Sequence, residues 1–126
     1  MKKIAAGFFA VMLAVFSFSY FAFSEGNMKH VTIKGEIVDL ACYLGEGEKG
    51  ASHKQCAIKC AKAGTPIGIL YEKSGNVYLL LPGHSKKERK DFAALTAKAG
   101  TTVTLKGMLV ESKSISALML GSGDDH

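Results

Sequence analysis

The stretch around which this chain is organised runs from Asp39 to Cys60 and reads DLACYLGEGEKGASHKQCAIKC. It holds all three cysteines of the 126-residue chain and one of its four histidines, in a Cys-x10-His-x2-Cys-x3-Cys pattern. Ser52 is a typical helix N-cap, and Gly64-Thr-Pro66 is a typical stop. The sequence therefore predicts a short helix over residues 53–63.

The sulfur atoms and the imidazole of this stretch are expected to meet. On the predicted helix His53, Cys56 and Cys60 share one face, because residues three and seven positions apart fall close together around the axis. Lysines occupy the opposite arc, so the sulfur-bearing face should pack inward. Cys42, expected at the end of a preceding strand, is the natural fourth partner.

Three interpretations of this constellation stay open. A disulfide from Cys42 to Cys60 or Cys56 would pin the helix to the strand and add roughly 3 kcal/mol of stability. Three thiolates and the imidazole of His53 would instead form a soft-metal site for Zn(II) or Cu(I). A thiol redox centre is the third interpretation, although Cys-x3-Cys lacks the Cys-x2-Cys geometry of thioredoxin-like motifs.

Outward from this stretch, the pattern alternates strands and helices. Apolar alternation predicts a first strand over residues 30–40, with Gly35 at a bend or bulge. A flexible loop is expected over residues 45–50. Ser85-Lys-Lys-Glu88 matches a capping box that opens a second helix. Phe92, Leu95 and Ala99 should form the inner face of that helix. The remaining strands are expected over residues 67–72, 77–81, 101–111 and 114–120.

This order predicts a mainly β fold, namely a five-stranded OB-like Greek-key barrel with two short helices. The cysteine-bearing helix would be an insertion between the first and second strands, and the second helix would join the third and fourth. The barrel should span residues 25–120, and the Gly-rich tail over residues 121–126 should be disordered. OB barrels serve unrelated functions, so the fold alone assigns none.

The N-terminal segment predicts export. Lys2 and Lys3 precede an apolar run, and Ala22-Phe-Ser24 is typical of a cleavage site, so residues 1–24 are expected to be a signal peptide. An uncleaved anchor helix is the alternative. Without Lys2 and Lys3 the formal charge falls from +5 to about +3, a mild excess. We therefore expect a periplasmic or secreted protein with no stable membrane insertion after cleavage.

The chain also resembles a group of small exported bacterial domains. The resemblance rests on Gly35-Glu-Ile-Val-Asp39 with Cys42, on the Cys56-Ala-Ile-Lys-Cys60 helix, and on Val103-Thr-Leu-Lys-Gly107. The group has a Gly-x-Val-x-Asp-x-x-Cys start, a Cys-x3-Cys helix and a closing Val-x-Val-x-Gly strand. The resemblance covers most of the mature chain and implies an exported OB-like domain, but no particular activity.

Taken together, the sequence predicts a small binding protein whose metal ligands are Cys42, His53, Cys56 and Cys60, with Zn or Cu(I) bound for sequestration rather than turnover. The motifs of haem attachment, nucleophilic serine, P-loop and zinc-protease sites are all missing, so no catalytic residue is expected. Nucleic acid is excluded as a partner by export and by the scarcity of strand aromatics. The alternative is a disulfide-stabilised OB-fold module, without metal, that binds another exported protein.

Overall fold

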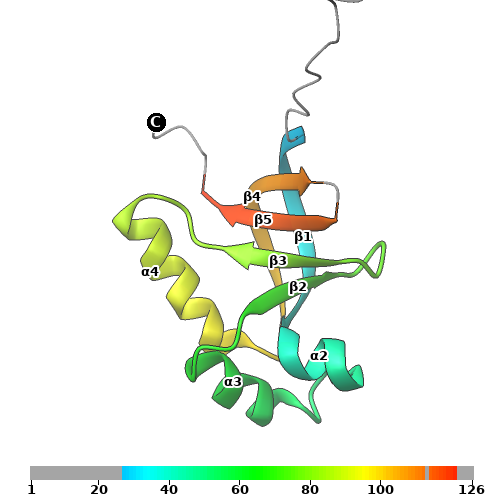
Figure 1. Cartoon of the computed structure of the whole chain (residues 1–126). Helices are drawn as coiled ribbons and strands as arrows, with labels where there is room; N and C mark the ends of the chain where they lie inside the picture. The colour runs from blue at the N-terminus through cyan, green and yellow to red at the C-terminus, as the bar shows by residue number, and fades with distance from the viewer. Residues whose placement is uncertain (1–26, 113, 122–126) are drawn as a thin grey trace, which may run out of the picture.

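A closed barrel of five strands is the centre of the structure (Figure 1). The computed structural model describes residues 27–112 and 114–121. Within the described residues the strands are β1 (Asn27–Asp39), β2 (Ile67–Tyr71), β3 (Val77–Leu81), β4 (Thr102–Ser112) and β5 (Ile115–Leu120). Their order around the barrel is β1-β2-β3-β5-β4. The prediction of a mainly β, five-stranded barrel is confirmed.

Three α-helices and one 3-10 helix accompany these strands in the described part of the chain. They are α2 (Leu40–Glu46), α3 (Lys54–Lys62), α4 (Lys86–Leu95) and η1 (Thr96–Lys98). The sequence predicted only two helices, and α2 is the one that was missed. It replaces part of the loop expected over residues 45–50 and places Cys42 in a helix, so the expectation of Cys42 at a strand end is wrong.

β1 is the longest strand and joins two parts of the barrel. Its first ten residues, 27–36, pair antiparallel with β4, and its last five, 35–39, pair antiparallel with β2. Gly35 belongs to both ladders, where it faces Tyr71 on one side and Val103 on the other. A Cβ at Gly35 would lie 2.2 Å from the carbonyl oxygen of Leu70. This crowding explains why the residue predicted to mark a bend must be glycine.

The core fills the barrel and extends under the helices. Its buried aliphatic side chains include Ile33, Ile37, Ile67, Ile69, Leu80, Leu95 and Leu118. Ala57 and Ala61 of α3 are buried, so that helix packs its small residues onto the same core. In α4, Leu95 is buried and Phe92 packs half-buried against the cluster. The predicted inner face of the second helix is therefore confirmed for Phe92 and Leu95, whereas Ala99, although buried, lies beyond α4 and η1.

Both helix starts can be compared with their predictions. Ser85 caps α4 through a complete capping box with Glu88, as the sequence predicted. For α3 the prediction is wrong, because the N-cap residue is His53 and no side chain caps the helix. Ser52 is exposed and belongs to the turn that precedes the helix.

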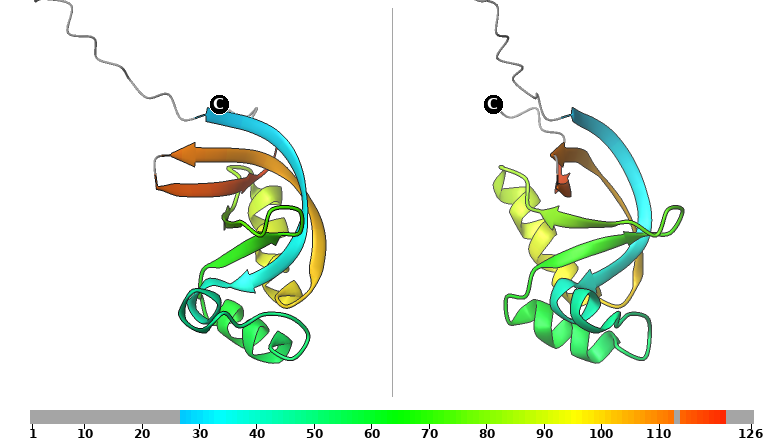
Figure 2. Two further views of the ribbon diagram at one scale, coloured as in Figure 1. Left: turned by 90° about the vertical axis from the view of Figure 1, so that its right-hand side faces the viewer. Right: turned by 45° about the vertical axis from the view of Figure 1, so that its right-hand side comes forward.

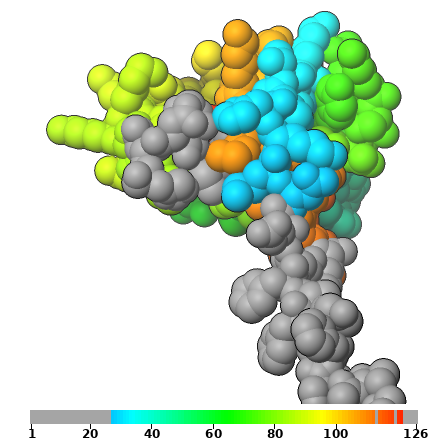
Figure 3. Space-filling model, turned by 90° about the horizontal axis from the view of Figure 1, so that it is seen from above, coloured from blue at the N-terminus to red at the C-terminus, as the bar shows by residue number. Residues whose placement is uncertain are grey.

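The helices occupy distinct regions of the molecule. α2 and α3 lie together at one end of the barrel, and α4 runs along its side (Figures 1 and 2). α3 packs on β1 and η1, and η1 continues directly from α4. Figure 3 looks onto the opposite end, where β1 and β4 lie side by side. All three cysteines are thus gathered at the α2–α3 end.

Two predicted segments, the signal peptide and the tail, lie wholly or largely outside the described residues. The predicted signal peptide, residues 1–24, and residues 122–126 of the predicted tail lie outside the described residues. Across residues 27–112 and 114–121, no helix has the length and apolar character needed to cross a membrane.

Candidate metal centre

Asp39 is the residue from which the site is built. It ends β1 and is the N-cap of α2, where its Oδ1 accepts a hydrogen bond from the backbone N–H of Cys42 at 2.9 Å. At the other end of α2, Gly47 adopts a left-handed conformation (φ 72°) and its N–H closes the helix on the carbonyls of Cys42 and Tyr43. α2 is therefore fixed at both ends, and Cys42 sits in its first turn.

The loop between the two helices is tied back to the barrel. The Gly50 N–H donates to Oε1 of Glu36 on β1. The Leu40 N–H at the start of α2 donates to the carbonyl of Pro66, just beyond α3, at 2.9 Å. These bonds hold both helices against β1. They bring Cys42 of α2 over the face of α3 that carries Cys56 and Cys60.

The donor atoms form two overlapping groups. Cys42, His53 and Cys56 offer donor atoms that all lie within 4.8 Å of one another, and so do Asp39, Cys42 and Cys60. Cys42 belongs to both groups. A Zn–S bond is about 2.3 Å, so two sulfurs on one ion lie at most about 4.6 Å apart. Donor atoms within 4.8 Å of one another are therefore close to the spacing that a single ion requires.

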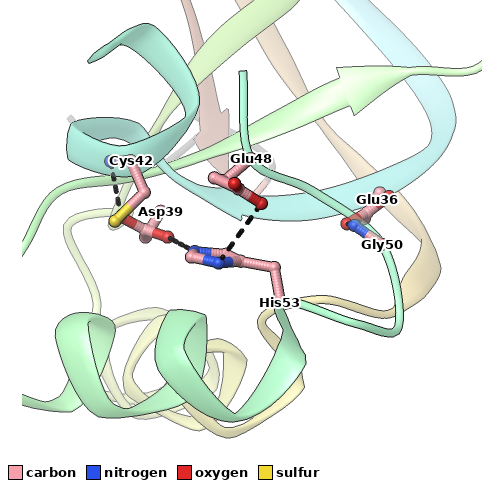
Figure 4. Close-up of polar contacts among 6 residues, drawn as sticks. All are labelled: Glu36, Asp39, Cys42, Glu48, Gly50 and His53. Atoms are coloured by element: carbon pink, nitrogen blue, oxygen red, sulfur yellow. Dashed lines mark hydrogen bonds and ion pairs between the residues drawn. The ribbon is translucent and has the colours of Figure 1, made fainter. Parts of the chain in front are cut away.

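His53 is held between two carboxylates (Figure 4). Its Nε2 lies 3.1 Å from Oδ2 of Asp39, and its Nδ1 lies 3.7 Å from Oε2 of Glu48. The Asp39 side chain is fully buried and the His53 side chain is 11% exposed, whereas that of Glu48 is 46% exposed. Asp39 therefore orients both the helix that carries Cys42 and the imidazole. A carboxylate on one ring nitrogen is typical of metal-binding histidines.

The polar contacts shift the ionisation of these groups. Burial of Asp39 acts to raise its pKa, but bonds from the Cys42 backbone and side chain and from His53 outweigh it, so the pKa is lowered. The pKa of Cys42 is raised to about 12, chiefly because its side chain hydrogen-bonds to Asp39 and secondly by burial. Burial, followed by a hydrogen bond with Cys56, raises the pKa of Cys60. A metal ion must therefore displace protons from Cys42 and Cys60 when it binds.

Exposure differs among the three cysteines. Cys42 and Cys60 are half-buried, and Cys56 is exposed. The expectation that the whole sulfur-bearing face of α3 packs inward is therefore only partly met, since Ala57 and Ala61 take the most buried positions. No disulfide joins the three cysteines in this structure.

The four residues predicted as ligands are thus all at one end of the barrel, but they divide between two groups. Cys42, His53 and Cys56 meet directly, and Cys60 meets Cys42 together with Asp39. The sequence did not predict Asp39 as a ligand. Its additional place among the candidate donors depends on α2. The sequence signal for that helix was Asp39 itself, because aspartate is a preferred N-cap residue.

The arrangement is suited to binding a soft or borderline cation. Thiolate and imidazole donors prefer Zn(II) or Cu(I), and Cys42 could serve as a ligand in either group.

Comparisons with known proteins find no relative of this chain. No protein-family model, curated protein or solved structure matches the chain.

Proposed function

We propose that this protein is an exported metal-binding protein that holds Zn(II) or Cu(I) through Cys42, His53, Cys56 and Cys60. Its role is binding or sequestration rather than turnover. The proposal accounts for all three cysteines and the histidine with one ion, whereas a single disulfide would leave one thiol without a role.

The observation that carries this proposal is the position of Cys42. Its sulfur takes part in both donor groups, one with His53 and Cys56 and the other with Asp39 and Cys60. These residues come from separate parts of the chain, the start of α2 and two turns of α3. Bringing two half-buried thiols beside a buried carboxylate disfavours their ionised forms, and a cation would relieve that cost.

We also propose that the barrel is OB-like and that the α2–α3 segment is an insertion between its first two strands. The strand order β1-β2-β3-β5-β4, the parallel pairing of β3 with β5, and the helix between β3 and β4 support this assignment. Export to the periplasm or the medium is proposed from Lys2, Lys3 and the apolar run that follows them.

The second candidate is a disulfide-stabilised module that binds an exported protein partner. It is favoured by the same short distances, because the sulfur of Cys42 lies within 4.8 Å of those of both Cys56 and Cys60. A bridge would require the two sulfurs to close to about 2.05 Å. The two candidates differ in how many thiols stay free and in whether a metal is bound.

The test begins with protein purified from its export compartment without reductant. Thiol titration, intact mass and elemental analysis are made on the same sample. The proposal expects three free thiols and one equivalent of Zn or Cu. One bridge, one free thiol and no metal would support the module instead if the same protein, after full reduction, still binds neither Zn(II) nor Cu(I).

Variants then assign the ligands. Cys42→Ser should weaken metal binding most, because Cys42 is common to both donor groups. Cys56→Ser and Cys60→Ser should each weaken it strongly, and His53→Ala less, where water can replace the imidazole. Gln55→Ala is the matched control, since Gln55 is exposed on the same helix. Binding of Zn(II) and Cu(I) no tighter than about micromolar in the fully reduced protein would refute the proposal.

A further inference from the structure

The ligands of the proposed site differ in how far solvent can reach them. Asp39 is only 1% exposed. Cys42 and Cys60 are half-buried, and Cys56 alone among the cysteines is exposed. A reagent from solution therefore meets Cys56 first. The sulfur of Cys42, which is less exposed, lies within 4.8 Å of the Cys56 sulfur.

We propose that metal binding at this site is controlled by thiol oxidation, with Cys56 as the thiol that first reacts with a disulfide oxidant and Cys42 as the thiol that completes a Cys42–Cys56 bridge. This inference rests on the proposed function, because it concerns regulation of the same site. The oxidant class is a disulfide, RSSR, of a small thiol or of a thiol-oxidising protein.

The chemistry proceeds in two exchanges. The Cys56 thiolate attacks one sulfur of RSSR, the S–S bond breaks, and a Cys56–S–S–R mixed disulfide forms as RS⁻ leaves. The Cys42 thiol then gives up its proton to solvent, and its thiolate attacks Sγ of Cys56 and displaces the second RS⁻. In total the two cysteines lose two electrons and two protons, and RSSR is reduced to two RSH.

The structure favours this pair over the two other possible bridges. Cys56 and Cys60 lie one turn apart on α3, and a disulfide within one helix is strained because the side chains project in parallel. A bridge between Cys42 and Cys60 would join two half-buried thiols, so neither is the first to meet the oxidant. Cys42 and Cys56 come from different helices, their sulfurs lie within 4.8 Å of each other, and Cys56 is exposed to solvent.

Closing this bridge removes the metal site. The group of Cys42, His53 and Cys56 would lose both sulfurs, and the group of Asp39, Cys42 and Cys60 would lose its shared ligand. The donors left would be one thiol, one imidazole and one carboxylate, without the second thiolate that selects a soft ion. Bound metal and the disulfide are therefore mutually exclusive states of one site.

The experiment treats reduced protein, metal-free or loaded with Zn(II), with oxidised glutathione. Zn(II) is chosen because it has no redox chemistry of its own. Samples are quenched with an alkylating agent and analysed by intact mass and peptide mapping, while a colorimetric chelator reports released Zn(II). The expected first products are glutathione on Cys56 and then a Cys42–Cys56 bridge with Cys60 alkylated. One Zn(II) should be released for each bridge formed.

Variants distinguish the contribution of solvent access to Cys56 from that of the proximity of Cys42 to Cys56. Cys56→Ser should slow glutathione attachment by about tenfold or more. Cys42→Ser should let the mixed disulfide on Cys56 accumulate, because the resolving thiol is gone. Cys60→Ser should still form the Cys42–Cys56 bridge. Gln55→Ala controls for changes to the exposed face of α3 and should match the wild type within about twofold.

Two results would overturn the inference. One is a first bridge between Cys42 and Cys60 while Cys56 stays unmodified, and the other is Zn(II) that stays bound after the bridge has formed. Either result can occur with metal affinity intact, so it would leave the proposed function standing. A reduced protein that binds neither Zn(II) nor Cu(I) would instead refute the proposed function and, with it, the control of metal binding by oxidation.

Discussion

Replacing Asp39 tests the site and its scaffold together. Asp39→Ala removes the N-cap of α2, where the carboxylate accepts from the Cys42 N–H at 2.9 Å, and the contact with Nε2 of His53 at 3.1 Å. Asp39→Asn is the matched variant. It keeps the size of the side chain and an acceptor for the Cys42 N–H, but it removes the negative charge beside the imidazole.

The magnitudes follow from those two contacts. Loss of an N-cap costs about 1 kcal/mol, and a hydrogen bond that involves a charged group contributes about 1.5–3 kcal/mol. Because ionised Asp39 is also penalised by its own burial, we expect Asp39→Ala to lower the free energy of unfolding by about 2–4 kcal/mol. Asparagine caps helices as well as aspartate does, so Asp39→Asn should cost about half as much or less.

The assay is urea unfolding of reduced, metal-free protein at pH 7, followed by metal titration of each variant. Both variants should bind metal about 10- to 100-fold more weakly, since the imidazole loses the carboxylate that orients it. Glu46→Ala, at the exposed C-terminal end of α2, is the control and should change stability by less than about 0.5 kcal/mol. An Asp39→Ala protein with wild-type stability and wild-type metal affinity would refute this reasoning.

Four further predictions concern the barrel, the thiols and export. Gly35→Ala should destabilise the protein by at least about 1–3 kcal/mol in urea unfolding, because its Cβ would meet a β2 carbonyl oxygen at 2.2 Å. Gly45→Ala is the contrast. A Cβ at position 45 would meet nothing within 4 Å, and alanine is favoured over glycine inside a helix, so this change should stabilise α2 by about 0.5–1 kcal/mol. Leu95→Ala should cost about 2–5 kcal/mol by leaving a cavity, and a cost under about 0.5 would show that α4 lies outside the core. The raised pKa of Cys42 stabilises the reduced, metal-free protein below the ordinary thiol value of 9.0. That stability should fall as the pH rises toward about 12, a loss that Cys42→Ser would not show in parallel melts. N-terminal sequencing of exported protein should begin at Glu25, and recovery of the intact N-terminus in membranes would contradict cleavage.

Local signals in the sequence predicted much of the barrel. β3 begins and ends at the expected residues, 77–81, because a turn and an apolar run mark both of its ends. The capping box of α4 was likewise local and was predicted correctly. α2 was missed because it is only seven residues long and because Gly45 and Gly47, near its C-terminal end, are typical of a loop. Gly47 in fact ends the helix in the left-handed conformation.

The candidate site was predicted less completely, for a different physical reason. The periodicity of α3 placed His53, Cys56 and Cys60 on one face. Periodicity does not show how deeply each side chain on that face is buried, so the exposure of Cys56 was not predicted. The division of the ligands into two groups depends on how α2 packs over α3. That packing comes from bonds between distant residues, such as Leu40 to Pro66, which no local pattern encodes.

The position of Asp39 has a consequence for how this chain can change. One side chain ends a strand, starts a helix and holds an imidazole, so the requirements of folding and of the proposed metal binding coincide at a single residue. A library selected only for folded protein would therefore retain aspartate or the other good cap, asparagine, there, whether or not any ligand was present. Cys56 is different, because it is exposed and caps nothing. Tolerance of substitution at Cys56 under folding selection, and its loss when metal is required for survival, would separate the two requirements.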